Sequence, residues 1–67
     1  MVKFSKRLKN LREEKGLSTR QLAQAINVSD RAIQRWEKEE RIPNVNAIIL
    51  LAQFFGVSAG YLLGLEN

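Results

Sequence analysis

The 67-residue sequence contains no cysteine and no histidine, and aromatic residues make up only 7% of it. Without cysteine no disulfide framework can form, so nothing in the sequence indicates secretion. The side chains that hold most structural zinc ions are also missing, and we expect no metal site and no cofactor. Nucleophilic catalysis by a cysteine–histidine or serine–histidine pair is excluded for the same reason.

Other catalytic arrangements are missing as well. No glycine-rich loop of the kind that cradles a nucleotide phosphate is present. The acidic pairs Glu13-Glu14 and Glu39-Glu40 consist of adjacent residues. Adjacent side chains on a helix point about 100° apart, so neither pair can converge on one substrate. The sequence therefore does not predict an enzyme.

Long hydrophobic runs are absent too. No apolar stretch approaches the roughly 20 residues of a membrane-spanning helix. The first ten residues, MVKFSKRLKN, are basic and lack the apolar centre of a signal peptide. We expect a cytoplasmic protein without a membrane partner, folded as one domain over residues 1–67.

Positive charge is what the sequence has in excess. Eleven lysines and arginines face seven acidic residues, which gives a formal net charge of +4. The residues from Lys3 to Arg12 include five cations and no acid. Such a balance suits nucleic acid or another acidic surface. The alternative for the N-terminal run is a solvated face that only keeps the protein soluble.

The segment from Leu17 to Lys38 has the pattern of two short helices joined by a tight turn. Ser18 and Gln21 form a capping-box pattern at the start of the first helix. Its apolar stripe comes next, and Asn27 tolerates the left-handed conformation of a sharp helix end. Ser29 then caps the second helix. The stripe of the first helix consists of Leu22, Ala23 and Ile26.

The second of these helices has two unlike faces. Ile33 and Trp36 are three residues apart and share an apolar face. The polar residues Arg31, Gln34, Arg35 and Lys38 fall on the opposite face. Trp36 is therefore expected in the core and not as a platform for stacking bases.

Three further helices are expected. The first spans residues 5–15 with its stripe at Phe4, Leu8 and Leu11, and ends at Gly16. Another spans residues 45–55 after an Asn44 cap, and a short last one spans residues 58–63, with Leu62 closing the core. The inward stripe of helix 45–55 is predicted as Val45, Ile48, Leu51, Ala52 and Phe55.

The end of the second short helix is ambiguous. Glu39 follows where a glycine cap would be usual, and glutamate takes a left-handed conformation only with strain. Either the helix ends differently or it runs one residue longer.

The segment from Leu17 to Lys38 resembles the helix-turn-helix of Cro and phage repressors, the XRE family. Counted from Thr19, that family has apolar residues at offsets 3, 7, 9, 14 and 17, a small residue at 4 and glycine at 8. This chain has Leu22, Ile26, Val28, Ile33, Trp36, Ala23 and Asn27 there, so only Asn27 departs from the pattern. The resemblance extends to Arg12, to Arg41–Pro43 and to LAQFFGVSAGYLLG at residues 51–64. It implies an all-α fold, a compact five-helix lambda-repressor-like domain with its helix-turn-helix at about residues 18–38.

The resemblance also implies functional residues and double-stranded DNA as the partner. An arginine at the place of Arg12 pairs with a glutamate at the place of Glu37, so we predict a partly buried ion pair that ties the first helix to the third. The base-reading positions correspond to Asp30, Arg31 and Arg35, with Gln34 beside them. For Asp30 two roles stay open: accepting from cytosine N4, or favouring the helix N-terminus electrostatically. The predicted phosphate contacts are Thr19, Arg20, Ser29, Lys38 and Arg41, and Arg7 and Lys6 are candidates for flanking phosphates.

More apolar residues occur near the C-terminus than a core of this size needs. An exposed apolar patch is typical of a partner surface. We predict a homodimer of a transcription regulator, in the simplest case a repressor, that binds a palindromic operator. The interface candidates are Leu50, Phe54, Tyr61 and Leu65. The alternative function for the helices over residues 45–55 and 58–63 is to bind a toxin, as in an antitoxin, or another protein antagonist. The alternative to an interface is that these are scattered surface hydrophobic residues.

Overall fold

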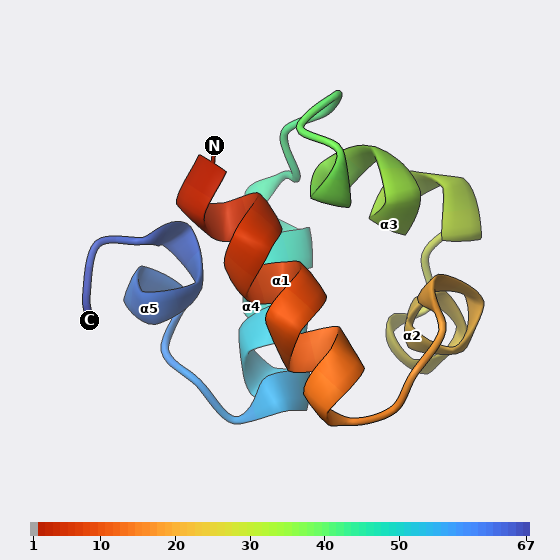
Figure 1. Ribbon diagram of the computed structural model, residues 1–67, viewed down its shortest axis with the longest axis horizontal. Coiled ribbons are helices and arrows are strands. Elements are labelled where there is room, and N and C mark those ends of the chain that lie inside the picture. The colour runs from red at the N-terminus through yellow and green to blue at the C-terminus, as the bar shows by residue number, and fades with distance from the viewer. Residues whose placement is uncertain (1) are drawn as a thin grey trace.

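The computed structural model describes residues 2–67 and contains five helices and no strand within them. In the view of Figure 1, α1 runs in front of α4, with α2 and α3 on one side and α5 on the other. The predicted all-α, five-helix fold is confirmed. None of the helices in this range is long and apolar enough to span a bilayer. The helices are α1 (Val2–Glu14), α2 (Thr19–Ile26), α3 (Asp30–Glu37), α4 (Val45–Phe55) and α5 (Ala59–Leu63).

Most helix boundaries agree with the expectation from the sequence. Asn44 caps α4 by accepting the Ala47 N–H at 2.8 Å, and α5 begins directly after its cap Ser58. The exception is α1, which was expected to begin near Ser5 and instead begins at Val2. Ser5 is therefore inside the helix, and its side chain is buried.

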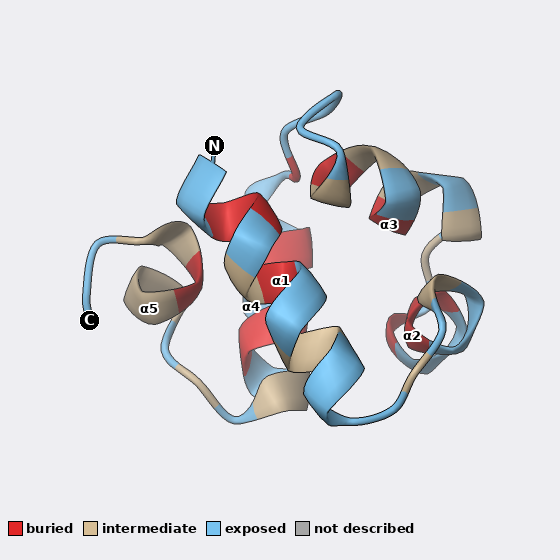
Figure 2. Ribbon diagram, in the orientation of Figure 1, coloured by how far each residue is buried: buried red, intermediate tan, exposed pale blue. Residues whose placement is uncertain are grey.

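One cluster of buried side chains joins all five helices (Figure 2). It includes the predicted Phe4, Leu8, Leu22, Ile33 and Leu62, each at most 1% exposed. The other members are Ala23, Ile26, Trp36, Ala47, Ile48 and Leu51.

The predicted inward stripe of α4 was wrong at its first residue, Val45. Val45 is 73% exposed, and Phe55 is only partly buried at the edge of the core. Side chains on a helix tilt toward its N-terminus, so Val45 in the first turn projects past the core. Ala47 occupies the inward position in that turn instead.

Every helix of residues 2–67 is followed by a residue with positive φ. Three of these residues are Gly16, Gly56 and Gly64, and a fourth is Asn27 with φ 59°. The fifth is Glu39, with φ 64°. Its N–H bonds to Trp36 O, and the Glu40 N–H bonds to Arg35 O at 2.9 Å, the two bonds of a Schellman motif. Both helix ends considered from the sequence were wrong. The helix α3 stops at Glu37, and Glu39 takes the strained left-handed conformation after it.

Candidate nucleic-acid interface

The turn between α2 and α3 is fixed by local hydrogen bonds. The capping box of α2 is present: Gln21 N–H donates to Ser18 Oγ at 3.1 Å, and Ser18 N–H donates to Gln21 Oε1 at 2.8 Å. After the left-handed Asn27, Val28 N–H bonds back to Ala23 O at 2.9 Å. Ser29 Oγ then accepts the Ala32 N–H at 3.1 Å and starts α3. The orientation of α3 relative to α2 therefore follows from this short stretch of sequence.

The inner side of α3 is attached to α1 as well as to the core. Ile33 is fully buried and Trp36 nearly so, as their shared face predicted. In addition, the buried Ser5 hydroxyl donates to Trp36 O at 2.6 Å. The sequence analysis missed this bond. Its only signal was a serine next to Phe4 in the apolar stripe of α1.

An ion pair forms a second connection between α1 and α3. Arg12 Nε lies 2.7 Å from Glu37 Oε2, and Arg12 Nη2 lies 3.0 Å from Glu37 Oε1, so the contact is bidentate. The two side chains are 13% and 9% exposed. Arg12 Nη1 also donates to Leu17 O at 2.8 Å. The hydrogen bond to Glu37 holds the pKa of Arg12 above its usual value.

The outer side of α3 carries the polar residues that the sequence placed there. Arg31, Gln34 and Lys38 are exposed, and Asp30 and Arg35 are half-buried. Asp30 Oδ1 is buried without a hydrogen-bond partner among residues 2–67. The exposed side chains of Arg31, Gln34 and Lys38 are therefore accessible to a partner.

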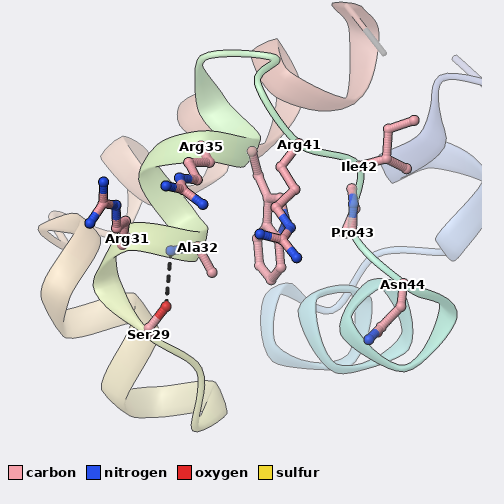
Figure 3. A pocket seen from close by; sticks show the side chains of 9 residues that line it. Ser29, Arg31, Ala32, Arg35, Arg41, Ile42, Pro43 and Asn44 are labelled. Atoms are coloured by element: carbon pink, nitrogen blue, oxygen red, sulfur yellow. Dashed lines mark hydrogen bonds between the residues drawn. The ribbon is translucent and has the colours of Figure 1, made fainter.

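Two hollows run along this side of α3. We call the first the loop-side hollow, since it lies between α3 and the loop before α4 (Figure 3); it has a volume of about 420 Å³. We call the second the mixed-charge hollow. The loop-side hollow is lined by Ser29, Arg31, Ala32, Arg35, Trp36, Arg41, Ile42, Pro43 and Asn44. The mixed-charge hollow is lined by Asp30, Arg31, Gln34, Arg35, Lys38 and Glu40.

The structure brings most of the predicted DNA-contacting residues to these hollows. Ser29 and Arg41 line the loop-side hollow, and Lys38 lines the other. Thr19 and Arg20 lie apart from both, in the first turn of α2. Ile42, Asn44 and Glu40 were not assigned to the interface from the sequence.

Arg7 has a different position from the one considered. Its Nη1 donates to Glu66 O at 2.6 Å and to Tyr61 O, and its guanidinium lies 4.2 Å from the centre of the Tyr61 ring. Arg7 therefore connects α1 to α5 and to the C-terminal residues. A contact of Arg7 with a flanking phosphate stays a prediction, to be made by the guanidinium nitrogens other than Nη1.

The sequence profile of a helix-turn-helix family matches residues 8–62. The chain belongs to the Cro/C1-type helix-turn-helix family. This is a family of DNA-binding transcription regulators and not a class of enzymes. Membership agrees with the capped turn between α2 and α3 and with the attached, one-sided α3.

Curated relatives carry corresponding names. The chain is 35% identical over 66 residues to the HTH-type transcriptional activator BcrR of Enterococcus faecalis, covering 98% of this chain and 32% of BcrR. It is 29% identical over 66 residues to the HTH-type transcriptional regulator ImmR of Bacillus subtilis, covering 98% of this chain and 52% of ImmR. The chain thus spans about a third to a half of the length of these relatives.

A solved structure has nearly the same length and fold. The restriction-modification controller protein C.AhdI from Aeromonas hydrophila superimposes with a TM-score of 0.83 at 31% sequence identity. The match covers 91% of this chain and 92% of C.AhdI.

Proposed function

We propose that this domain binds double-stranded DNA of a specific sequence by placing α3 in the major groove. The observation that carries the proposal is the two-sidedness of α3: Ile33 and Trp36 are buried against the core, while Arg31 and Gln34 face solvent. A helix fits the major groove of B-DNA, where each base pair presents a distinct pattern of donors and acceptors. In a helix-turn-helix the preceding helix crosses the DNA backbone.

We assign base reading to four residues of α3: Asp30, Arg31, Gln34 and Arg35. Arginine can donate two hydrogen bonds to guanine O6 and N7, a pair worth about 1–3 kcal/mol of discrimination. Both roles of Asp30 stay open, since its unpartnered Oδ1 is buried and is not accessible to a base in this arrangement. Backbone phosphates would then be held by Thr19 and Arg20 on α2 and by Ser29, Lys38 and Arg41 around α3.

We further propose that the protein acts as a homodimer on a palindromic operator. Two helix-turn-helix domains related by twofold symmetry read half-sites about 34–36 Å apart. Occupation of such a site blocks polymerase without any further surface, so repression is the simplest regulatory outcome. The Enterococcus relative is named as an activator, and a promoter–reporter assay with the operator at different distances from the start site separates the two outcomes.

The experiment that tests the proposal is selection of random double-stranded DNA by the purified protein, followed by titration of the selected duplex at several salt concentrations. We expect a palindromic sequence for which the affinity of the protein falls steeply with salt. The reason is that lysines and arginines bound to phosphates release the salt cations condensed on the DNA. Enrichment of no sequence, with only salt-sensitive general binding, would contradict sequence-specific recognition.

A further inference from the structure

The residues that follow α5 fold back along that helix. We call residues 64–66 the return segment. Leu65 N–H donates to Gly60 O at 2.8 Å, and Ser58 Oγ donates to Glu66 Oε1 at 3.0 Å. In Figure 1 the segment lies on the side of α5 that is away from α3. Both its backbone and its carboxylate are therefore bound to α5.

Helix α1 holds the return segment from another direction. Arg7 Nη1 donates to Glu66 O at 2.6 Å and to Tyr61 O, and the guanidinium covers the Tyr61 ring. The aliphatic part of Lys3 lies against Gly64, where an added Cβ would be 2.6 Å from Lys3 Cβ. A helix as short as α5 is not stable by itself. The position of the return segment thus depends on α1 as well as on α5.

Gly60 is the point of α5 that the return segment approaches most closely. A Cβ at this position would lie 2.2 Å from Glu66 Oε2. Gly60 does not have positive φ, so the backbone of α5 does not require a glycine here. Glycine within a helix is less stable than alanine. The close approach of Glu66 is therefore the structural reason for a glycine at this position.

The return segment presents one apolar side chain to solvent. Leu65 is 80% exposed, the highest value among the exposed large hydrophobic residues of the described range. An exposed side chain on a fixed backbone loses little conformational freedom when it is buried by a partner. Charges of both signs lie beside it, from Lys3 and Glu66. A second copy of this chain, related by twofold symmetry, offers the same apolar residue and the complementary charges.

We propose that Arg7 is a positioning residue of the homodimer: through the return segment it fixes Leu65 for contact with a second copy of the chain. The inference rests on the proposed function, which includes the homodimer. Arg7 acts at a distance from the second copy, because its Nη1 binds carbonyl groups of its own chain. The contact between α1 and α5 then sets the affinity of the dimer, although α1 contributes none of the predicted interface residues.

The first part of the test measures the dimer dissociation constant by sedimentation equilibrium without DNA. In Arg7→Ala we expect this constant to rise at least about tenfold, since twofold symmetry makes each lost contact count twice. The circular dichroism spectrum should still be that of a folded domain. Arg7→Lys keeps a cation that can donate to both carbonyl groups and should recover part of the affinity. Lys9→Ala, at an exposed position of α1, is the matched control and should dimerise like the natural protein.

The second part asks whether Arg7 acts through Leu65. If it does, the double variant Arg7→Ala/Leu65→Ala should dimerise no more weakly than Leu65→Ala alone, because the two changes remove the same contact. Hydrogen exchange reports the return segment directly, and protection of the Leu65 N–H should fall in Arg7→Ala.

Gly60→Ala separates positioning from stability. The new methyl group displaces the Glu66 side chain, while α5 gains a better helix former. We expect a weaker dimer with a melting temperature at or above that of the natural protein. A role in stability alone predicts that dimer affinity and melting temperature change in the same direction.

The outcomes distinguish this inference from the proposed function. An unchanged dissociation constant in Arg7→Ala, or losses from Arg7→Ala and Leu65→Ala that add in the double variant, would overturn the positioning role while the homodimer stands. A dimer of Gly60→Ala that is as strong as the natural one would remove the Glu66 contact from the proposal. A natural protein that stays monomeric at every concentration would overturn the proposed homodimer itself.

Discussion

At the scale of single residues, Glu39 is the position where sequence and conformation disagree most. The other four residues with positive φ are glycine or asparagine, which tolerate it, whereas Glu39 carries a Cβ that crowds the backbone. We predict that Glu39→Gly stabilises the domain by about 1 kcal/mol, after allowance for the greater freedom of glycine in the unfolded chain. For a domain of this size that corresponds to a melting temperature higher by about 5 °C in a thermal unfolding experiment.

The neighbouring glutamate provides the control for this prediction. Glu40→Gly changes the net charge by the same amount, but Glu40 does not have positive φ. It should therefore give no gain and a small loss. Equal stabilisation by both variants would show that removal of a negative charge, and not relief of strain, is the cause.

Arg12 contributes to the attachment of α3 through one ion pair. We predict that Arg12→Ala destabilises the domain by about 3 kcal/mol, because the largely buried Glu37 carboxylate would be left without its partner. The preferred DNA sequence should not change, since the ion pair joins α3 to α1 and Arg12 lines neither hollow. Urea unfolding and the DNA selection measure the two effects, and Lys9→Ala, at an exposed position of α1, controls for loss of a cation. An unchanged unfolding midpoint for Arg12→Ala would contradict the structural role.

The protonation of Arg12 does not add a pH dependence to this contribution. Its pKa is raised in the folded protein, so the stability it contributes is fully present below its unfolded pKa and is lost only as the pH rises through the folded pKa. Both values lie far above neutral pH.

At the scale of helices, local sequence signals predicted most of the fold. The caps Ser18, Ser29, Asn44 and Ser58 and the stops Gly16, Asn27, Gly56 and Gly64 act through bonds within a few residues of themselves. For that reason the boundaries of α2, α4 and α5 could be predicted from short patterns. The apolar spacing within α3 likewise predicted its buried and its outward face.

The features that the sequence did not predict depend on contacts between distant segments. The Ser5–Trp36 bond joins residues 31 positions apart, and no local pattern indicates that a serine will meet a carbonyl of another helix. The position of Arg7 depends on Tyr61 and Glu66 in the same way. The loop-side hollow combines α3 with the loop before α4, so Asn44 could be predicted as a cap but not as a member of the site.

In α3, a side chain that reads bases and a side chain that only contacts phosphates should respond differently to substitution. We predict that Arg35→Ala relaxes the preference for one base pair in each half-site while the domain keeps its melting temperature. The reason is that a bidentate arginine–guanine contact discriminates by about 1–3 kcal/mol, whereas a phosphate contact does not discriminate. Repeating the DNA selection with the variant measures this directly. Uniform weakening on all sequences would place Arg35 entirely at phosphates, next to Arg41 in the loop-side hollow.

At the scale of the whole molecule, the apolar surface of the C-terminal half bears on oligomeric state. Among the predicted interface residues, Leu50 is 42% and Leu65 is 80% exposed, and the neighbouring Ile49 is 44% exposed. Phe54 and Tyr61 are half-buried, with Phe54 packed against the core and Tyr61 under Arg7. Leu65 is held in place by its N–H bond to Gly60 O at 2.8 Å. The proposed interface would therefore depend on the leucines more than on the aromatic residues.

The exposed leucine of α4 leads to a prediction about the mass of the oligomer in solution. Leu50→Glu places a charge on the exposed face of α4, where burial in a dimer would be costly, while the folded monomer can keep the charge in water. We expect a dimer of the natural protein to become a monomer in sedimentation equilibrium, with a circular dichroism spectrum that does not change. Gln53→Glu adds the same charge to another exposed position of α4 and should leave the dimer intact. For Leu50→Glu, affinity for the full operator should fall far more than affinity for an isolated half-site, because only the full operator requires two domains at once. An equal fall on both duplexes, with unchanged mass, would remove Leu50 from the interface and leave the pairing of the two domains to the DNA itself.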